Sequence, residues 1–131
     1  MSYDIYVHRF EGGESAPLDK IIVAEVLDPY VVVRVPDNEF LQLDMGRNER
    51  ADVYFSSDTS VTFTRFGGER IMDVVAELLE RLGASLVLLG GTVVLRQEAD
   101  REHLPQLMRD DDWSVVVART GQEIMRAIEA S

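Results

Sequence analysis

Cysteine is missing from this 131-residue chain. Its absence excludes a disulfide framework and a thiolate metal site, so packing alone must hold the fold, and we expect no cofactor. The chain also lacks an apolar run near the roughly 18 residues that a membrane-spanning helix needs. Its start, MSYDIYVHRF, is charged where a signal peptide is apolar. We therefore expect a cytoplasmic protein without a membrane partner.

Catalytic signatures are scarce as well. The sequence contains no HExxH and no GxSxG motif, and its two histidines, His8 and His103, are far apart along the chain. His8 follows Asp4 and Tyr6 at the two-residue spacing of one strand face, which would suit an acid–base group but also arises in ordinary strands. We do not expect an enzyme.

Two short stretches resemble ligand sites without meeting their requirements. FGGE, residues 66 to 69, is a glycine-rich turn from strand to helix, but it lacks the lysine of a phosphate loop and places Glu69 where the anion would sit. Asp110, Asp111 and Asp112 lack the alternate spacing and distal glutamate of a calcium loop. We interpret the first stretch as a tight corner and the second as a solvated loop, and we expect no metal.

Positive charge is also in short supply. Thirteen Lys and Arg residues face 24 Asp and Glu residues, which gives a net charge of −11. Such a surface repels nucleic acids and anionic lipids and favours encounters with basic proteins. An acidic surface is also common among proteins that have no such partner.

What the chain does have is enough apolar content, 46%, for one core, and we predict a single domain over residues 1–131. Alternation predicts a strand over 3–10, and a helical stripe predicts a helix over 17–28 with Ser15 as N-cap. Residues 30–35 fit a strand or an extended link. Three antiparallel strands are expected over 40–45, 51–55 and 60–65.

The second half of the chain begins with its clearest helix, over 69–82, which Gly83 ends. Residues 85–96 read as a hairpin that turns at Gly90 and Gly91. Both arms are apolar at successive positions, which implies burial on two faces or a place near the sheet centre. A short helix broken before Pro105, a strand over 113–118 and a C-terminal helix follow. Thr120 and Glu123 have the spacing of a capping box.

These elements predict an α+β fold: a two-layer sandwich with a mostly antiparallel sheet, helices on one face, and a ferredoxin-like or related arrangement. The other face, carrying Thr62, Thr64 and Asp4 or Tyr6, should be exposed or covered by the C-terminal segment. Alternation places Asp4, Tyr6 and His8 on one side of the first strand, and Thr62 and Thr64 on one side of another. If the two strands are adjacent and in register, these residues form one patch. We predict that a ligand or partner contacts this patch, with Arg65 or Arg9 at its border. Trp113, which begins a later strand, is either a core anchor or a contact anchor for a partner.

Several stretches together, among them MSYDIYVHRFEGGE, ADVYF, VVAELLERLGA and GGTVVL before HLP, resemble a group of small uncharacterised actinobacterial proteins of the Streptomyces type. The resemblance covers nearly the whole chain, but its motifs are structural and it implies no activity, substrate or cofactor. In size and acidity the chain is also similar to immunity proteins of bacterial toxin systems.

Two functions fit these observations. The first is a non-catalytic acidic module that binds a basic protein, such as an inhibitor or an immunity-type protein. The alternative is a domain that binds a small ligand in a pocket between the sheet and the helices, lined by Tyr6, His8, Phe63 and Arg65.

Overall fold

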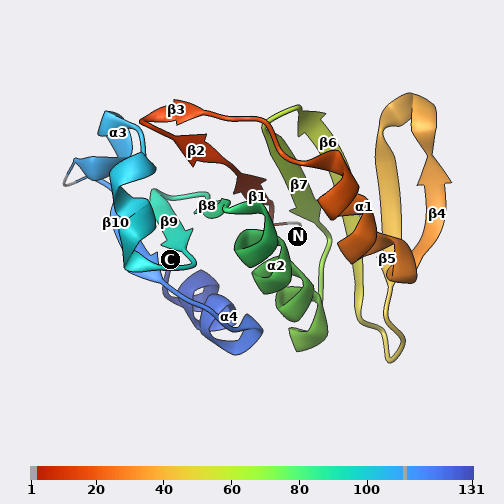
Figure 1. The fold of residues 1–131 in the computed structure, drawn as a ribbon. Coiled ribbons are helices and arrows are strands. Elements are labelled where there is room, and N and C mark those ends of the chain that lie inside the picture. Colours follow the sequence, from red (N-terminus) through yellow and green to blue (C-terminus); the bar gives the residue numbers. More distant parts are fainter. Residues whose placement is uncertain (1–2, 111) are drawn as a thin grey trace.

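The computed structural model describes residues 3–110 and 112–131, and its centre is an eight-stranded sheet (Figure 1). Across the sheet the strands follow the order β10-β9-β8-β1-β7-β6-β5-β4. The strands are β1 (Ile5–His8), β4 (Val31–Val35), β5 (Phe40–Asp44), β6 (Arg50–Ser57), β7 (Ser60–Thr64), β8 (Ser85–Leu88), β9 (Thr92–Leu95) and β10 (Ser114–Val117). Among the strand pairs of the described residues, only β9–β10 is parallel. The predicted α+β fold with a mostly antiparallel sheet is confirmed.

Three helices lie in front of this sheet in Figure 1: α1 (Lys20–Leu27), α2 (Glu69–Leu82) and α4 (Gly121–Ala130). They share one apolar core with strand residues such as Ile5, Val61 and Phe63, all fully or almost fully buried. α2 packs against both α1 and α4. Because α2 carries an apolar stripe from Ile71 to Leu82, it lies at the centre of the helical layer.

Within residues 3–110 and 112–131, the opposite face of the sheet is covered over β8, β9 and β10 and at the His8 end of β1. The 3₁₀ helix η3 (Glu98–His103) and the one-turn helix α3 (Gln106–Arg109) cross the β8–β10 part. Beneath them lies a second apolar cluster of Phe10, Val93, Leu95 and Leu104. The predicted two-sided burial of the 85–96 hairpin is therefore confirmed, because Val94 belongs to the helical core and Val93 to this second cluster.

A small hairpin supports the covered half. Its strands are β2 (Phe10–Glu11) and β3 (Glu14–Ser15), and Gly12 and Gly13 turn between them with positive φ. The backbone amides of these two glycines donate to His103, one to its Nδ1 at 3.2 Å and one to its carbonyl at 3.1 Å. The hairpin is thereby tied to the end of η3.

The ends of the helices follow the sequence in part. Thr120 and Glu123 form the predicted capping box of α4, and Gly83 ends α2 in the left-handed conformation. The predicted start of α1 is wrong, since Asp19 and not Ser15 is its N-cap and Ser15 belongs to β3. Asp19 accepts from two amides of the first turn, so a carboxylate replaces the expected hydroxyl.

The 30–35 stretch, left open as strand or link, is the edge strand β4. It pairs antiparallel with β5 and has a register shift between Val31 and Val33. Two short 3₁₀ helices, η1 (Asp28–Tyr30) and η2 (Pro36–Asn38), flank it. Each contains a proline in its first turn, so the strand is bounded on both sides by residues that end regular pairing.

One prediction concerns the contact between α4 and α2. A Cβ added at Gly121 would lie 2.6 Å from the backbone N of Asp73 and 2.8 Å from the carbonyl C of Met72. Alanine normally stabilises a helix more than glycine does, but here the backbone of α2 would have to move to make room for the added Cβ. We expect Gly121→Ala to lower the free energy of unfolding by about 1–3 kcal/mol in urea denaturation.

Gly67→Ala is the matched control, because nothing lies within 4 Å of a Cβ there and the residue does not have positive φ. It should change stability by no more than about 0.5 kcal/mol. Equal stability of the two variants would contradict the close packing of α4 on α2.

Candidate functional site

The part of the sheet that η3 and α3 leave uncovered is formed by β1, β7, β6 and β5. β1 lies between β7 and β8, and its Tyr6 is the register partner of Thr62. The two strands are thus adjacent and in register, as the patch requires. Ile5 and Val7 point into the helical core, so Tyr6 and His8 face the opposite way.

Pairing registers extend this row across the uncovered strands. Phe40 pairs with Tyr54, Tyr54 with Thr62, and Thr62 with Tyr6. The rings of Phe40 and Tyr54 lie 4.9 Å apart in a tilted arrangement, and Tyr54 is 41% exposed. A second row runs beside the first through Gln42, Asp52 and Thr64. We call the surface formed by Tyr6, Phe40, Gln42, Asp52, Tyr54, Thr62 and Thr64 the open face.

Polar groups on the open face are already engaged with one another. The Thr62 hydroxyl donates to the Ser56 hydroxyl at 3.1 Å, and Ser56 donates to the carbonyl of Ser60 at 3.1 Å. Gln42 Nε2 donates to Asp52 Oδ1 at 3.3 Å. Thr62 and Asp52 are buried, so the hydroxyl chain holds the strands together and the aromatic rings offer the contact area.

His8 takes a different role from the one its spacing indicated. Its ring stacks on Phe10 with centroids 4.4 Å apart, and its Nε2 is 2.8 Å from the Ser15 hydroxyl. Burial lowers the pKa of His8 below its usual value, so the ring is neutral at pH 7. It does not pack against α2. His8 therefore binds the β2–β3 hairpin to the sheet at the border of the open face.

The remaining predicted contact residues lie apart. Arg65 is exposed directly after β7 with φ of 51°, next to the half-buried Thr64. Trp113 instead packs against the second apolar cluster, directly before β10. The structure therefore brings Tyr6, Thr62, Thr64 and Arg65 to one region and places Trp113 in another.

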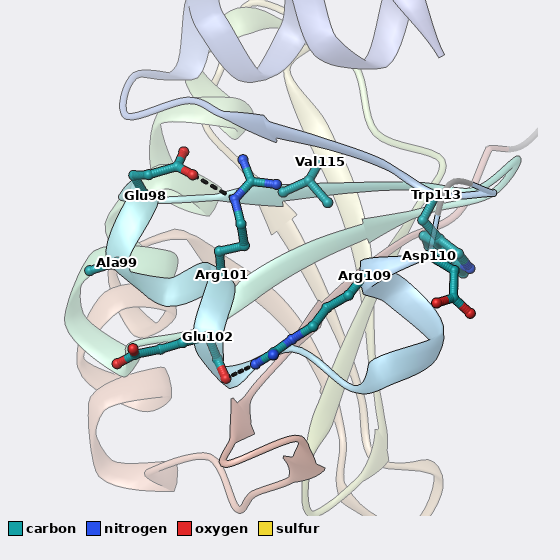
Figure 2. A pocket seen from close by; sticks show the side chains of 8 residues that line it. All are labelled: Glu98, Ala99, Arg101, Glu102, Arg109, Asp110, Trp113 and Val115. Atoms are coloured by element: carbon teal, nitrogen blue, oxygen red, sulfur yellow. Dashed lines mark hydrogen bonds and ion pairs between the residues drawn. The ribbon is translucent and has the colours of Figure 1, made fainter.

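Trp113 lines a cavity of about 600 Å³ between η3, α3 and the start of β10 (Figure 2). Two arginines flank it, yet both are engaged. Arg101 donates to Glu98 at 2.5 Å, which lowers the pKa of that carboxyl, and Arg109 donates to the carbonyls of Glu102 and Leu104. Glu98 balances the charge of Arg101, and Glu102 and Asp110 also line the cavity, so its lining does not favour an anion.

The acidic stretch beside this cavity falls partly outside the described residues, since Asp111 is one of those not described. Within residues 3–110 and 112–131, no group of three histidine, aspartate or glutamate side chains is placed to hold a metal ion. The interpretation of this stretch as a solvated loop remains a prediction.

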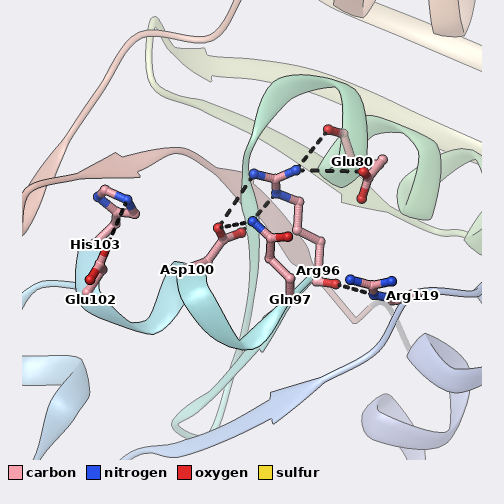
Figure 3. Close-up of polar contacts among 7 residues, drawn as sticks. All are labelled: Glu80, Arg96, Gln97, Asp100, Glu102, His103 and Arg119. Carbon is pink, nitrogen blue, oxygen red and sulfur yellow. Dashed lines mark hydrogen bonds and ion pairs between the residues drawn. The ribbon is translucent and has the colours of Figure 1, made fainter.

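An ion pair that sequence reasoning missed fixes the cover in place (Figure 3). Arg96 Nε donates to the buried Asp100 at 2.9 Å, and Gln97 Nε2 donates to the same carboxylate at 3.1 Å. Arg96 also pairs with Glu80 near the end of α2 at 3.7 Å, and its carbonyl accepts from Arg119. Arg96 and Asp100 are four residues apart, as in an ordinary helical ion pair, so no sequence signal distinguished this pair.

The FGGE corner holds a carboxylate of the chain itself. Gly68 has φ of 99° and precedes α2, and the backbone N of Arg70 donates to Glu49 Oε1 at 3.2 Å. Arg70 also pairs with Glu49 through its side chain at 3.6 Å. Glu49 thus occupies the anion position at this helix N-terminus, which agrees with its interpretation as a corner.

The expected pocket between sheet and helices has a different lining. Phe63 is fully buried in the helical core and Tyr6 lies on the other face, so these two cannot line one cavity. A groove of about 370 Å³ lies instead between α1 and the β4–β5 hairpin. Its apolar lining includes Val23, Leu27, Val35, Leu41 and Phe55, and its charged lining includes Lys20, Asp28, Arg34, Glu39 and Asp58.

None of the helices described is long and apolar enough to cross a membrane. Comparisons with protein-family models, with curated proteins and with solved structures find no match to this chain.

Proposed function

We propose that this protein is a non-catalytic module that binds a basic protein in the cytoplasm, as an inhibitor or an immunity-type protein does. The observation that carries the proposal is the open face. A sheet face in a folded domain is normally covered or strongly polar, whereas this one presents Phe40 and Tyr54 side by side, with Tyr6 in the same row on the far side of Thr62.

Tyrosines on a fixed surface suit protein recognition. They bury much area at a small entropic cost, because each has few rotatable bonds and carries a hydroxyl for a polar contact. The hydrogen bonds among Ser56, Ser60 and Thr62 hold the strands beneath them. A partner would therefore meet a surface that needs little rearrangement.

Charge favours a basic partner. The chain carries −11, and a field of this sign speeds encounters with positive proteins and slows encounters with nucleic acids. Arg65 at the border of the open face could contact a carboxylate of the partner, even if the rest of the partner's surface is basic. His8, neutral and bonded to Ser15, is already used in structure, which supports a binding role over acid–base catalysis.

The test is capture from an extract of the source cells on immobilised protein at low and at high salt. We expect a basic protein to be recovered at low salt, with affinity that falls steeply as salt rises. Tyr6→Ala combined with Tyr54→Ala should weaken binding by at least about 2 kcal/mol, as loss of central aromatic contacts does. Binding is measured by titration calorimetry with the recovered protein.

Leu107→Ala is the matched control, since Leu107 is 67% exposed on α3 and lies outside the open face. It should leave affinity unchanged. The proposal fails if low salt recovers no basic protein, or if the tyrosine variant binds as well as the control.

The groove beside α1 supports a second candidate function, the binding of a small molecule. Its volume of about 370 Å³ falls within the usual range for ligand sites. Its lining combines apolar side chains with charged ones, among them Lys20 and Arg34. Both cations are paired, Lys20 with Asp58 at 3.4 Å and Arg34 with Asp28 at 3.0 Å, so the groove suits a compact, mainly apolar molecule. Of the two functions, only the binding of a small molecule requires this groove to be accessible.

Anilinonaphthalene sulfonate, whose apolar ring system can enter such a groove, tests this candidate. We expect its fluorescence to rise on binding, and Ala24→Phe to abolish the rise because Ala24 lines the groove and is exposed. Ala130→Phe, at the exposed end of α4, is the control and should have no effect. Equal fluorescence with both variants would remove the candidate.

A further inference from the structure

One edge of the sheet is unusually apolar. β4 is the last strand in the sheet order, with β5 as its neighbour, and no described strand pairs with its outer edge. Its sequence is VVVRV, and Val32 and Val33 are 58% and 39% exposed. The opposite edge strand, β10, has α3 packed against it.

Protection against unwanted pairing is weak along β4. Edge strands are normally defended by inward charges, by prolines within the strand or by covering segments. Here Pro29 and Pro36 lie outside the strand, and the register shift near Val32 is the one irregularity within it. The single charge, Arg34, bends back to Asp28 at 3.0 Å. The outer backbone groups thus remain ready to pair with another strand.

A second copy of the chain fits this edge poorly. Antiparallel pairing of two β4 strands about Val33 would set Asp37 of one copy beside Asp28 and Pro29 of the other, and each copy carries −11. Like charges in close register destabilise strand pairing. A segment with positive ends would instead meet Asp28 at one end of β4 and Asp37 and Glu39 at the other, all of them exposed.

We propose that β4 accepts an extended segment of a basic partner protein as an additional antiparallel strand. The backbone of the segment pairs with β4, its β-branched or aromatic side chains pack beside Val32 and Val33, and its flanking lysines or arginines meet the acidic ends. This contact surface is distinct from the open face, and it rests on the proposed function only for the basic character of the partner.

The probe for the test is a short synthetic peptide with lysines at both ends and alternating valine and threonine between them. At low salt we expect the β4 amides of the ¹⁵N-labelled protein to show the largest shift changes and slower hydrogen exchange when the peptide is added. The same peptide with a central proline cannot complete a strand and should bind at least about tenfold more weakly.

Variants of the edge provide the matched pair. Val32→Lys combined with Val33→Lys places positive charge against the basic peptide and should weaken binding about tenfold or more. Val32→Thr combined with Val33→Thr keeps the β-branched shape without charge and should stay within about threefold of the unchanged protein. Amide spectra of the free variants confirm that both keep the fold.

Each other outcome overturns the edge proposal. Shifts confined to the open face would place a basic ligand there and leave the proposed function standing. Concentration-dependent protection of β4 without peptide would assign the edge to a second copy. No change at β4 up to about 1 mM peptide excludes strand addition. The proposed function fails separately, when low-salt capture recovers no basic protein.

Discussion

The packing of α2 against one face of the central strands is the constraint on which the rest of the molecule depends. Its stripe of buried residues from Ile71 to Leu82 meets Ile5, Val61 and Phe63, and α1 and α4 pack on either side of it. A sheet of eight strands has a second face of equal extent, which these helices cannot reach. The two halves of that second face differ because other segments of the chain cover one half and leave the other uncovered.

Over β8, β9 and β10 the chain supplies its own cover. η3 and α3 lie on the second apolar cluster, and Arg96 with the buried Asp100 holds them to the end of α2. A buried charge is costly without a partner, so Asp100 must stay beside Arg96, and this requirement fixes the position of η3. The pair itself need not add net stability. Over β5, β6, β7 and the Tyr6 end of β1 no such segment exists among the described residues, and Tyr54 is 41% exposed there.

The sequence predicted the elements whose period is strong and local. The stripe of α2, the capping box at Thr120 and the turn at Gly90 and Gly91 all rest on contacts within a few residues, where propensity and capping rules apply. The start of α1 was misplaced because Ser15 and Asp19 are both good caps, and only the β2–β3 pairing, a contact that leaves Ser15 in a strand, decides between them.

Only the part of the candidate site that follows from alternation along single strands was predictable from the sequence. Alternation placed Tyr6, Thr62 and Thr64 on one side of their strands, but the rows that join them to Phe40 and Tyr54 depend on registers between strands distant in sequence. His8 obeys the same alternation and yet stacks on Phe10, because the β2–β3 hairpin turns back over it. Sequence alone left Trp113 as a core anchor or a contact anchor, and the parallel β9–β10 pair carries it to the covered half, where it packs against the second apolar cluster.

Whether the open face is bare in the free protein is the central question, and solvent paramagnetic relaxation measures it directly. With a soluble gadolinium chelate, the ring protons of Tyr54 and Tyr6 should relax strongly, while the methyl protons of Val93 and Leu95, buried under η3 and α3, should not. Comparable protection of the tyrosines and of these two residues would mean that another segment or another copy covers the face, and would contradict the account.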